Sequence, residues 1–160
     1  MEQKYAATVD KVFALLTEPK WLQERSAALG ELSAMVKARK SGGGVTLTMN
    51  RRVKRDLPGL VAKVLRSESD LIFEEVWSAA GDGNARSGTL AMEAVGQPVK
   101  MTAKFELVLA GKGCLYRITH TCKASVPLIG GVVEKFALGQ IEAGCADEFA
   151  YLVAYLKSHK

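Results

Sequence analysis

The chain has 160 residues, of which 48% are hydrophobic and 24% charged, and its formal net charge is +5. This composition is typical of a globular protein and excludes a disordered chain, while the longest apolar runs are too short to span a bilayer. The basic balance allows an anionic ligand, a membrane surface or nucleic acid as a partner without requiring any of them. The length predicts a single domain over residues 1–160.

The first predicted elements are a strand and two short helices. Residues 2–7 are typical of a short strand, and Thr8 can cap a helix whose apolar residues recur at helical spacing. Pro19 ends this helix, and a second short helix ends near Gly30. The opening segment has an acid at once and lacks an apolar stretch behind a basic start. It therefore argues against a signal peptide and predicts a cytoplasmic protein.

The middle of the chain alternates with the period of strands. Residues 32–39 and 45–49 predict a hairpin around the turn SGGG at 41–44, and a short helical turn is expected after Pro58. Four further strands follow in the segments DLIFEEVWS, ARSGTLAMEAV, VKMTAKFELVL and CLYRITHTCKA. The turn residues between these segments predict an antiparallel meander.

The last segment is helical from Ile129 or Gly130 onward. A helix of this length needs a partner for its apolar stripe, and the predicted sheet is the only large surface available. Strands with segregated helices predict an α+β fold. The stripe recurs at three- and four-residue steps and consists of Val133, Phe136, Ala137, Ile141, Cys145, Phe149, Leu152 and Leu156.

A family resemblance rests on three segments, YAATVDKVFALLTEPKW, FEEVW and VPLIGGVVEKFALGQIE. Together they resemble the START-like superfamily with the helix-grip fold, which includes polyketide cyclases and lipid-transfer domains, and within it a bacterial subfamily of uncharacterised function. The resemblance implies a curved antiparallel sheet of about seven strands wrapped around a long C-terminal helix, with two short helices after the first strand. It also implies a cavity between sheet and helix, but it does not define a reaction, because the fold hosts many functions.

Alternation along the strands indicates which side chains face this cavity. Residues 71–78 offer two faces, and the face with Phe73, Glu75 and Trp77 is favoured because it carries two aromatic rings. A carboxyl group that faces inward needs a partner. Arg51 continues the inward set of its own strand and is the candidate partner of Glu75.

Polar residues on the inward faces and on the long helix complete the candidate site. Gln140 and Glu148 border the apolar stripe of the helix, and Glu148 is expected at its solvent edge. Residue types alone favour a plainer interpretation, in which Arg51 and Glu75 lie at a solvated strand end and His120 is a core residue. The candidate ligand-binding residues are Met49, Arg51, Phe73, Glu75, Trp77, Met92, Met101, Phe105, Tyr116, His120, Phe136 and Gln140.

The segment RRVKR, residues 51–55, concentrates positive charge. The strand pleat sends Arg52 and Lys54 to one face and Arg51 and Arg55 to the other. No aromatic platform accompanies the cluster, so nucleic acid is not predicted as a partner. A solvated strand end is the favoured interpretation, and a rim that attracts an anionic headgroup is the next.

The cysteines and histidines do not predict a metal site. Cys114, Cys122 and Cys145 show neither a CxxC pair nor zinc spacing with the two histidines, His120 and His159. We therefore predict reduced thiols, no metal and no cofactor. The chain has no phosphate loop and no serine nucleophile motif, so no catalytic residue is assigned.

These observations favour a protein that binds a hydrophobic or amphipathic small molecule, such as a lipid or polyketide-like compound, between sheet and helix. The first alternative is an enzyme of the cyclase or hydratase kind, in which a polar residue of the same cavity moves a proton. The second is an interaction protein whose core is filled by its own side chains. We expect binding rather than catalysis, with no support for membrane contact and no indication of the oligomeric state.

Overall fold

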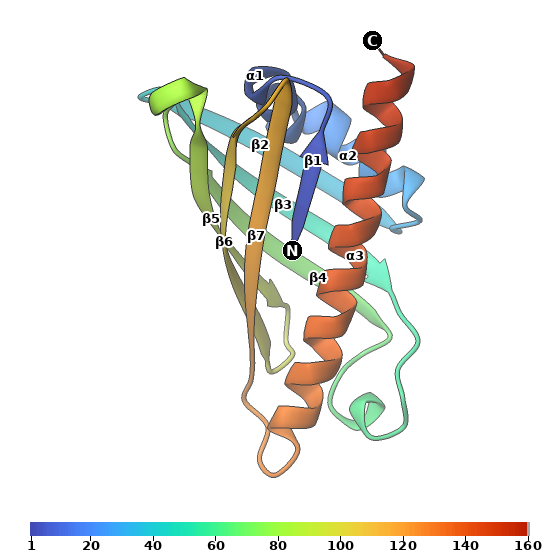
Figure 1. The fold of residues 1–160 in the computed structure, drawn as a ribbon. Coiled ribbons are helices and arrows are strands. Elements are labelled where there is room, and N and C mark those ends of the chain that lie inside the picture. The colour runs from blue at the N-terminus through green and yellow to red at the C-terminus, as the bar shows by residue number, and fades with distance from the viewer. Residues whose placement is uncertain (160) are drawn as a thin grey trace.

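The computed structural model describes residues 1–159 and has the predicted order of one strand, two short helices, six strands and one long helix (Figure 1). Two 3-10 helices, η1 and η2, lie in the connections on either side of the fourth strand. In chain order the elements are β1 (Glu2–Tyr5), α1 (Val9–Leu16), α2 (Pro19–Ala28), β2 (Ser33–Ser41), β3 (Gly44–Lys54), η1 (Val61–Lys63), β4 (Glu68–Trp77), η2 (Asp82–Asn84), β5 (Arg86–Ala94), β6 (Val99–Ala110), β7 (Gly113–Ala124) and α3 (Gly130–Ser158).

All strands belong to one antiparallel sheet in the order β1-β7-β6-β5-β4-β3-β2. Strands β2 to β7 therefore form the predicted meander, and β1 adds to its edge beside β7. The sheet curves around α3, while α1 and α2 lie at the end of the sheet near the carboxyl terminus of α3 (Figure 1). This α+β arrangement is the predicted helix-grip fold.

Capping and turn residues define where the elements begin. Thr8 Oγ1 accepts a hydrogen bond from the Lys11 amide at 3.2 Å at the start of α1, and Pro19 occupies the first turn of α2. Between β2 and β3, Gly42 and Gly43 have φ values of 57° and 80°. Glycine adopts two successive positive φ values without strain, and the resulting two-residue turn sets the register of the hairpin.

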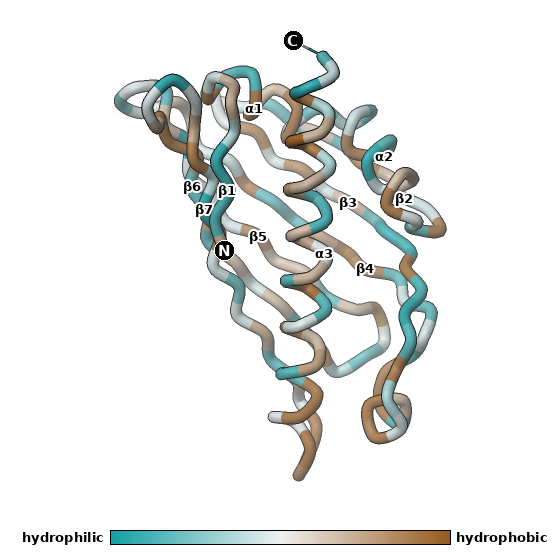
Figure 2. The backbone as a smooth tube through the Cα atoms, turned by 45° about the vertical axis from the view of Figure 1, so that its right-hand side comes forward, coloured by the Kyte–Doolittle hydropathy of each residue, from teal (hydrophilic) through white to brown (hydrophobic). Residues whose placement is uncertain are grey.

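The pleat of β4 places its apolar residues on the concave face of the sheet. Leu71, Phe73 and Trp77 are buried, whereas Ile72 and Val76 are exposed, which confirms the favoured face. Hydrophobic and hydrophilic residues alternate in the same way along the neighbouring strands (Figure 2). The concave face and α3 therefore share one core.

The middle of α3 packs less tightly than its two ends. Val133 near the beginning and Phe149 and Leu152 in the second half are buried. Between them, Ile141 and Cys145 of the predicted stripe are only partly buried. The core is therefore incomplete where this stretch faces the sheet. Within residues 1–159, no helix combines the length and apolarity that a membrane crossing requires.

Candidate ligand-binding pocket

A pocket of about 110 Å³ lies between the middle of α3 and the concave face of the sheet. Strands β3 to β7 contribute its floor, and α2 and α3 contribute its sides. The structure thus brings together residues that are far apart in the sequence. Ten of the predicted binding residues line the pocket: Met49, Arg51, Phe73, Glu75, Trp77, Met92, Met101, Tyr116, His120 and Gln140.

The other two predicted residues lie outside this pocket. The ring of Phe105 covers Gly88 on the neighbouring strand and packs on Trp77 with ring centroids 4.5 Å apart, so it fills the core beside the pocket. Phe136 is partly exposed and lines a neighbouring pocket of about 50 Å³, between α3 and the segment that follows β3. It lies one helical turn before Gln140, toward the amino-terminal end of α3, and is therefore beyond the end of the larger pocket.

The apolar part of the floor consists largely of methionines. Met49, Met92 and Met101 are buried there beside Phe73, each on the inward face that alternation predicts. Unbranched thioether side chains change rotamer readily, so such a surface adapts to ligands of different shapes. The floor can therefore enlarge without rearrangement of the sheet.

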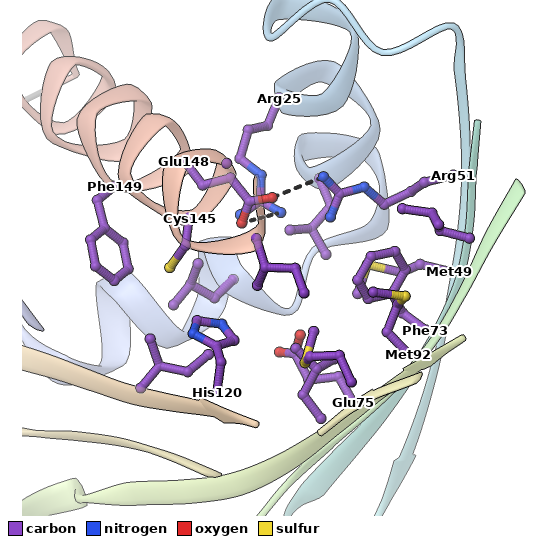
Figure 3. A pocket seen from close by; sticks show the side chains of 18 of the residues that line it. Arg25, Met49, Arg51, Phe73, Glu75, Met92, His120, Cys145, Glu148 and Phe149 are labelled. Carbon is purple, nitrogen blue, oxygen red and sulfur yellow. Dashed lines mark hydrogen bonds and ion pairs between the residues drawn. The ribbon is translucent and has the colours of Figure 1, made fainter. Parts of the chain in front are cut away.

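Glu75 brings a carboxyl group to this apolar floor, without a cationic partner in the described part of the chain. Trp77 Nε1 donates a hydrogen bond to Glu75 Oε1, and the carboxyl points from the sheet into the pocket (Figure 3). Burial raises the pKa of Glu75 to about 7, although the hydrogen bond from Trp77 and the charge of Arg25 oppose the rise. The carboxyl is therefore protonated in a large fraction of molecules at neutral pH.

The predicted pairing of Glu75 with Arg51 is wrong. The register of β3 and β4 places Leu47 opposite Glu75 and places Arg51 opposite Leu71. Arg51 and Glu75 are thus four positions apart along the strands, or about 13 Å. The Arg51 guanidinium instead donates to Glu31, with Nε at 2.9 Å from a carboxylate oxygen.

Glu148 of α3 joins Arg51 of β3 to Arg25 of α2 (Figure 3). Glu148 Oε1 accepts from Arg51 Nη2 at 2.9 Å, and Glu148 Oε2 lies 3.2 Å from Arg25 Nη2. Burial alone would raise the pKa of Glu148, but the two arginines hold it below its usual value, so the carboxylate is ionised. The expectation of a solvent-edge Glu148 is therefore wrong, because its side chain is only 23% exposed and bridges two cations.

Sequence reasoning missed Arg25 and Glu31. Arg25 lies on the buried face of α2 with Trp21 and Leu22, and its position on that stripe was the available signal. Glu31 lies in the connection between α2 and β2, where no periodicity applies. Both residues reach the cluster only because α2 packs beside β2 and α3.

Tyr116 and His120 of β7 place two more polar side chains on the pocket wall. The Tyr116 ring packs against Trp77 and Phe149, with centroids 6.2 Å and 5.7 Å away. Burial, and to a smaller extent the charge of Glu75, raises the pKa of Tyr116. Burial lowers the pKa of His120. Nδ1 of His120 is buried and has no hydrogen-bond partner among residues 1–159. Both side chains are therefore neutral at neutral pH, and His120 has an unused hydrogen-bonding atom.

Gly144 and Cys145 form the middle of the helical wall. A Cβ atom at Gly144 would meet no other atom within 4 Å, so this glycine leaves open space beside the pocket. Burial raises the pKa of Cys145 to about 12, which keeps the thiol protonated and makes it a poor nucleophile. All three cysteines are free, and the described residues contain no group of three side chains placed to hold a metal ion.

Solved structures with a similar fold come from several organisms. Protein Ms6760 from Mycobacterium smegmatis is 13% identical, with a TM-score of 0.58 over 99% of this chain and 90% of that one. A START superfamily protein from the same organism is 11% identical, with a TM-score of 0.57 over 100% and 97%. Norcoclaurine synthase from Thalictrum flavum, in complex with dopamine and hydroxybenzaldehyde, is 18% identical, with a TM-score of 0.52 over 97% and 84%. At these identities the likeness establishes the fold alone.

Comparison of the sequence with protein families gives a more specific result than the comparison of structures. No curated protein matches the chain. Residues 1–156 match the family described as "Protein of unknown function (DUF2505)". That match covers nearly every described residue, including both walls of the pocket. The chain, with its START-like helix-grip fold, therefore belongs to the DUF2505 family.

Proposed function

We propose that the chain binds a small molecule with an apolar body and a hydrogen-bonding group in the pocket between the sheet and α3. The observation that carries this proposal is the Glu75 carboxyl, which faces an apolar floor and, within residues 1–159, receives a hydrogen bond from Trp77 alone. A buried carboxyl without a full set of partners lowers the stability of a fold. Its presence is understandable if a ligand completes its hydrogen bonds.

The polar groups of the pocket suit a ligand with a hydroxyl or carbonyl group. With a pKa of about 7, Glu75 donates a hydrogen bond when protonated and accepts one when ionised. His120, on β7, lines the same pocket, and its buried Nδ1 lacks a partner among the described residues. Methionine side chains surround these groups and would contact the apolar part of the ligand.

The size of the pocket limits what it can enclose. A dry cavity of about 150 Å³ in another protein takes up benzene. The pocket of about 110 Å³ is smaller than that, so it fits a short alkyl chain as it stands and a single ring once the methionines move. A lipid or polyketide-like molecule, which the sequence favours, would place one end in the pocket and leave the remainder at the mouth.

An enzyme of the cyclase or hydratase kind is the second candidate, and Glu75 is again the observation that favours it. A carboxyl group with a pKa of about 7 is suited to act as a general acid or base at neutral pH. Binding is the first proposal because it requires only an open apolar pocket and unsatisfied polar groups. Proton transfer requires in addition a defined geometry between the catalytic group and the substrate.

The binding proposal can be tested with two glycine substitutions on α3. Gly144→Leu places a side chain in the pocket, and Gly139→Leu places the same side chain on an exposed part of the helix. Neither Cβ atom would meet an existing atom within 4 Å. Each change also removes a helical glycine, which favours the helix by up to about 1 kcal/mol, so loss of binding cannot be attributed to unfolding.

The measurement is an NMR titration of labelled protein with the neutral probe 3-phenylpropan-1-ol, beside native mass spectrometry of protein purified from its own host. We expect a bound small molecule in the host-derived protein and probe-induced shifts at the pocket residues. Gly144→Leu should weaken probe binding by about tenfold or more, or about 1.4 kcal/mol, because the leucine side chain takes up pocket volume that the probe needs. Equal binding by the two leucine variants, or no binding by the unsubstituted protein, would contradict the proposal.

A further inference from the structure

Arg55 is the third arginine that lines the pocket, and its side chain lies at the pocket mouth. It follows β3 and continues the inward alternation of Arg51 and Val53, as the strand pleat predicts. Its backbone amide donates to the Ser67 carbonyl at 2.8 Å, which holds this position against the start of β4. The side chain lines both the main pocket and the neighbouring pocket of about 50 Å³. It also lines an outer hollow of about 140 Å³ between β3 and α3.

The two other arginines already have carboxylate partners. Arg51 binds Glu31 and Glu148, and Arg25 lies 3.2 Å from Glu148. Arg55 forms no ion pair with any carboxylate within residues 1–159. Burial, together with the nearby Arg51 guanidinium, lowers the pKa of Arg55. The charge of Glu31 partly opposes this shift, but no carboxylate among residues 1–159 forms an ion pair with this half-buried guanidinium.

The charges at the mouth do not cancel. The cluster holds three guanidinium groups, Arg25, Arg51 and Arg55, against the two carboxylates Glu31 and Glu148. One positive charge therefore remains, and it faces the space that a ligand would occupy. The favoured interpretation of RRVKR as a solvated strand end is wrong for Arg51, while Arg52 and Lys54 do face solvent.

Neighbouring charges do not neutralise this excess. Lys54 and Asp147 line the outer hollow and contribute one charge of each sign, and Arg66 adds a cation to the lining of the neighbouring pocket. Glu75 lies deeper in the pocket, hydrogen-bonded to Trp77. Gln140, beside Arg55 in the lining of both pockets, adds a neutral amide and no charge. The mouth thus has a net positive charge close to an apolar interior.

We propose that the ligand is an amphipathic monocarboxylate whose carboxylate pairs with Arg55 at the mouth while its apolar part enters the methionine-lined pocket. This inference rests on the proposed function of the same pocket. The planar guanidinium offers parallel N–H donors that match the two oxygens of a carboxylate. A monocarboxylate also supplies negative charge where the cluster has an excess of positive charge. The position of Arg55 on both pockets allows the carboxylate to stay at the surface while the body of the ligand is buried.

A matched pair of probes tests the inference. 3-Phenylpropanoate and 3-phenylpropan-1-ol have the same ring and chain, and only the first is charged at neutral pH. We compare their dissociation constants for the unsubstituted protein, for Arg55→Gln and for Arg52→Gln by NMR titration. Arg52 is the control because it is exposed on the other face of β3 and pairs with Glu68 and Asp70.

The expected result is that the unsubstituted protein and Arg52→Gln bind the acid about tenfold more tightly than the alcohol, in line with one charge-assisted hydrogen-bonded pair near the surface. Arg55→Gln should bring this ratio close to one and leave the affinity for the alcohol unchanged. The substitution removes a cation that lies near Arg51, so the fold should tolerate it.

Each other outcome identifies what has failed. Equal affinities of the unsubstituted protein for acid and alcohol would overturn the monocarboxylate inference and leave the binding function intact. A preference for the acid that persists in Arg55→Gln would overturn the role of Arg55. Absence of binding by both probes would contradict the proposed function, and the inference would fall with it.

Discussion

The Glu75→Gln substitution tests the central feature of the pocket through stability. Burial raises the pKa of Glu75 from 4.5 to about 7 in the folded protein, whereas the unfolded chain keeps the ordinary value. Between these two values the folded protein holds a proton that the unfolded chain has released. Unfolding then releases a proton, so stability falls as pH rises from about 4.5 to about 7 and is constant, for this group, outside that window.

The magnitude follows from the separation of the two pKa values. A difference of about 2.5 pH units, at about 1.4 kcal/mol per unit, corresponds to about 3 kcal/mol of stability lost by pH 8. Glutamine has nearly the shape of the protonated acid, still accepts the hydrogen bond from Trp77 Nε1, and does not titrate. Glu75→Gln should therefore be close to neutral at pH 5 and should stabilise the protein by about 2–3 kcal/mol at pH 8.

Urea unfolding of both proteins at the two pH values measures this effect. The difference between the two values of ΔΔG isolates Glu75, because every other titrating group is common to the two proteins. Glu74→Gln is the matched control, since Glu74 is the adjacent residue of β4 and is exposed on the opposite face. A change in ΔΔG below about 0.5 kcal/mol between pH 5 and pH 8 would refute the argument, because Glu75 would then titrate normally in the folded state.

Two further predictions concern α3, and urea unfolding measures both. Glu148→Gln should destabilise the protein by about 3–5 kcal/mol because it leaves the charge of the buried Arg25 unpaired, whereas the exposed control Asp147→Asn should change stability by less than about 0.5 kcal/mol. Similar losses in these two variants would mean that the ion pairs contribute little. Phe149→Ala should cost about 3–5 kcal/mol because its ring is buried, but Phe136→Ala, which the sequence places under the sheet, should cost only about 1–2 kcal/mol. A larger loss for Phe136 than for Phe149 would contradict the assigned helix faces.

Much of the fold could be predicted because its signals are local. The cap at Thr8, the glycine pair 42–43 and the alternation of the strands each depend on a few consecutive residues. The apolar stripe of α3 also required a broad partner, and only a sheet could supply it. These signals agree with one another, which is why element order and topology followed from them.

The candidate site could be predicted only in part. Alternation identified inward-facing residues such as Met49 and His120, because the pleat gives each strand only two faces. It could not supply the partner of Glu75, since that depends on the register of β3 against β4. The connection between those strands has no turn signature of fixed length. The contact of Arg25 with Glu148 depends on how α2 and α3 pack together, which no local pattern encodes.

Two features that reduce stability occur on the same pocket. One is the Glu75 carboxyl, whose burial disfavours its charged form. The other is Gly144, since a glycine inside a helix costs about 1 kcal/mol relative to alanine, and a Cβ atom would fit there without contact. Glutamine in place of Glu75 and alanine in place of Gly144 would each give a more stable fold. Packing therefore explains neither residue. A ligand that approaches the helix backbone at Gly144 and hydrogen-bonds to Glu75 explains both. The filled-core alternative would require each residue to be present for a separate reason.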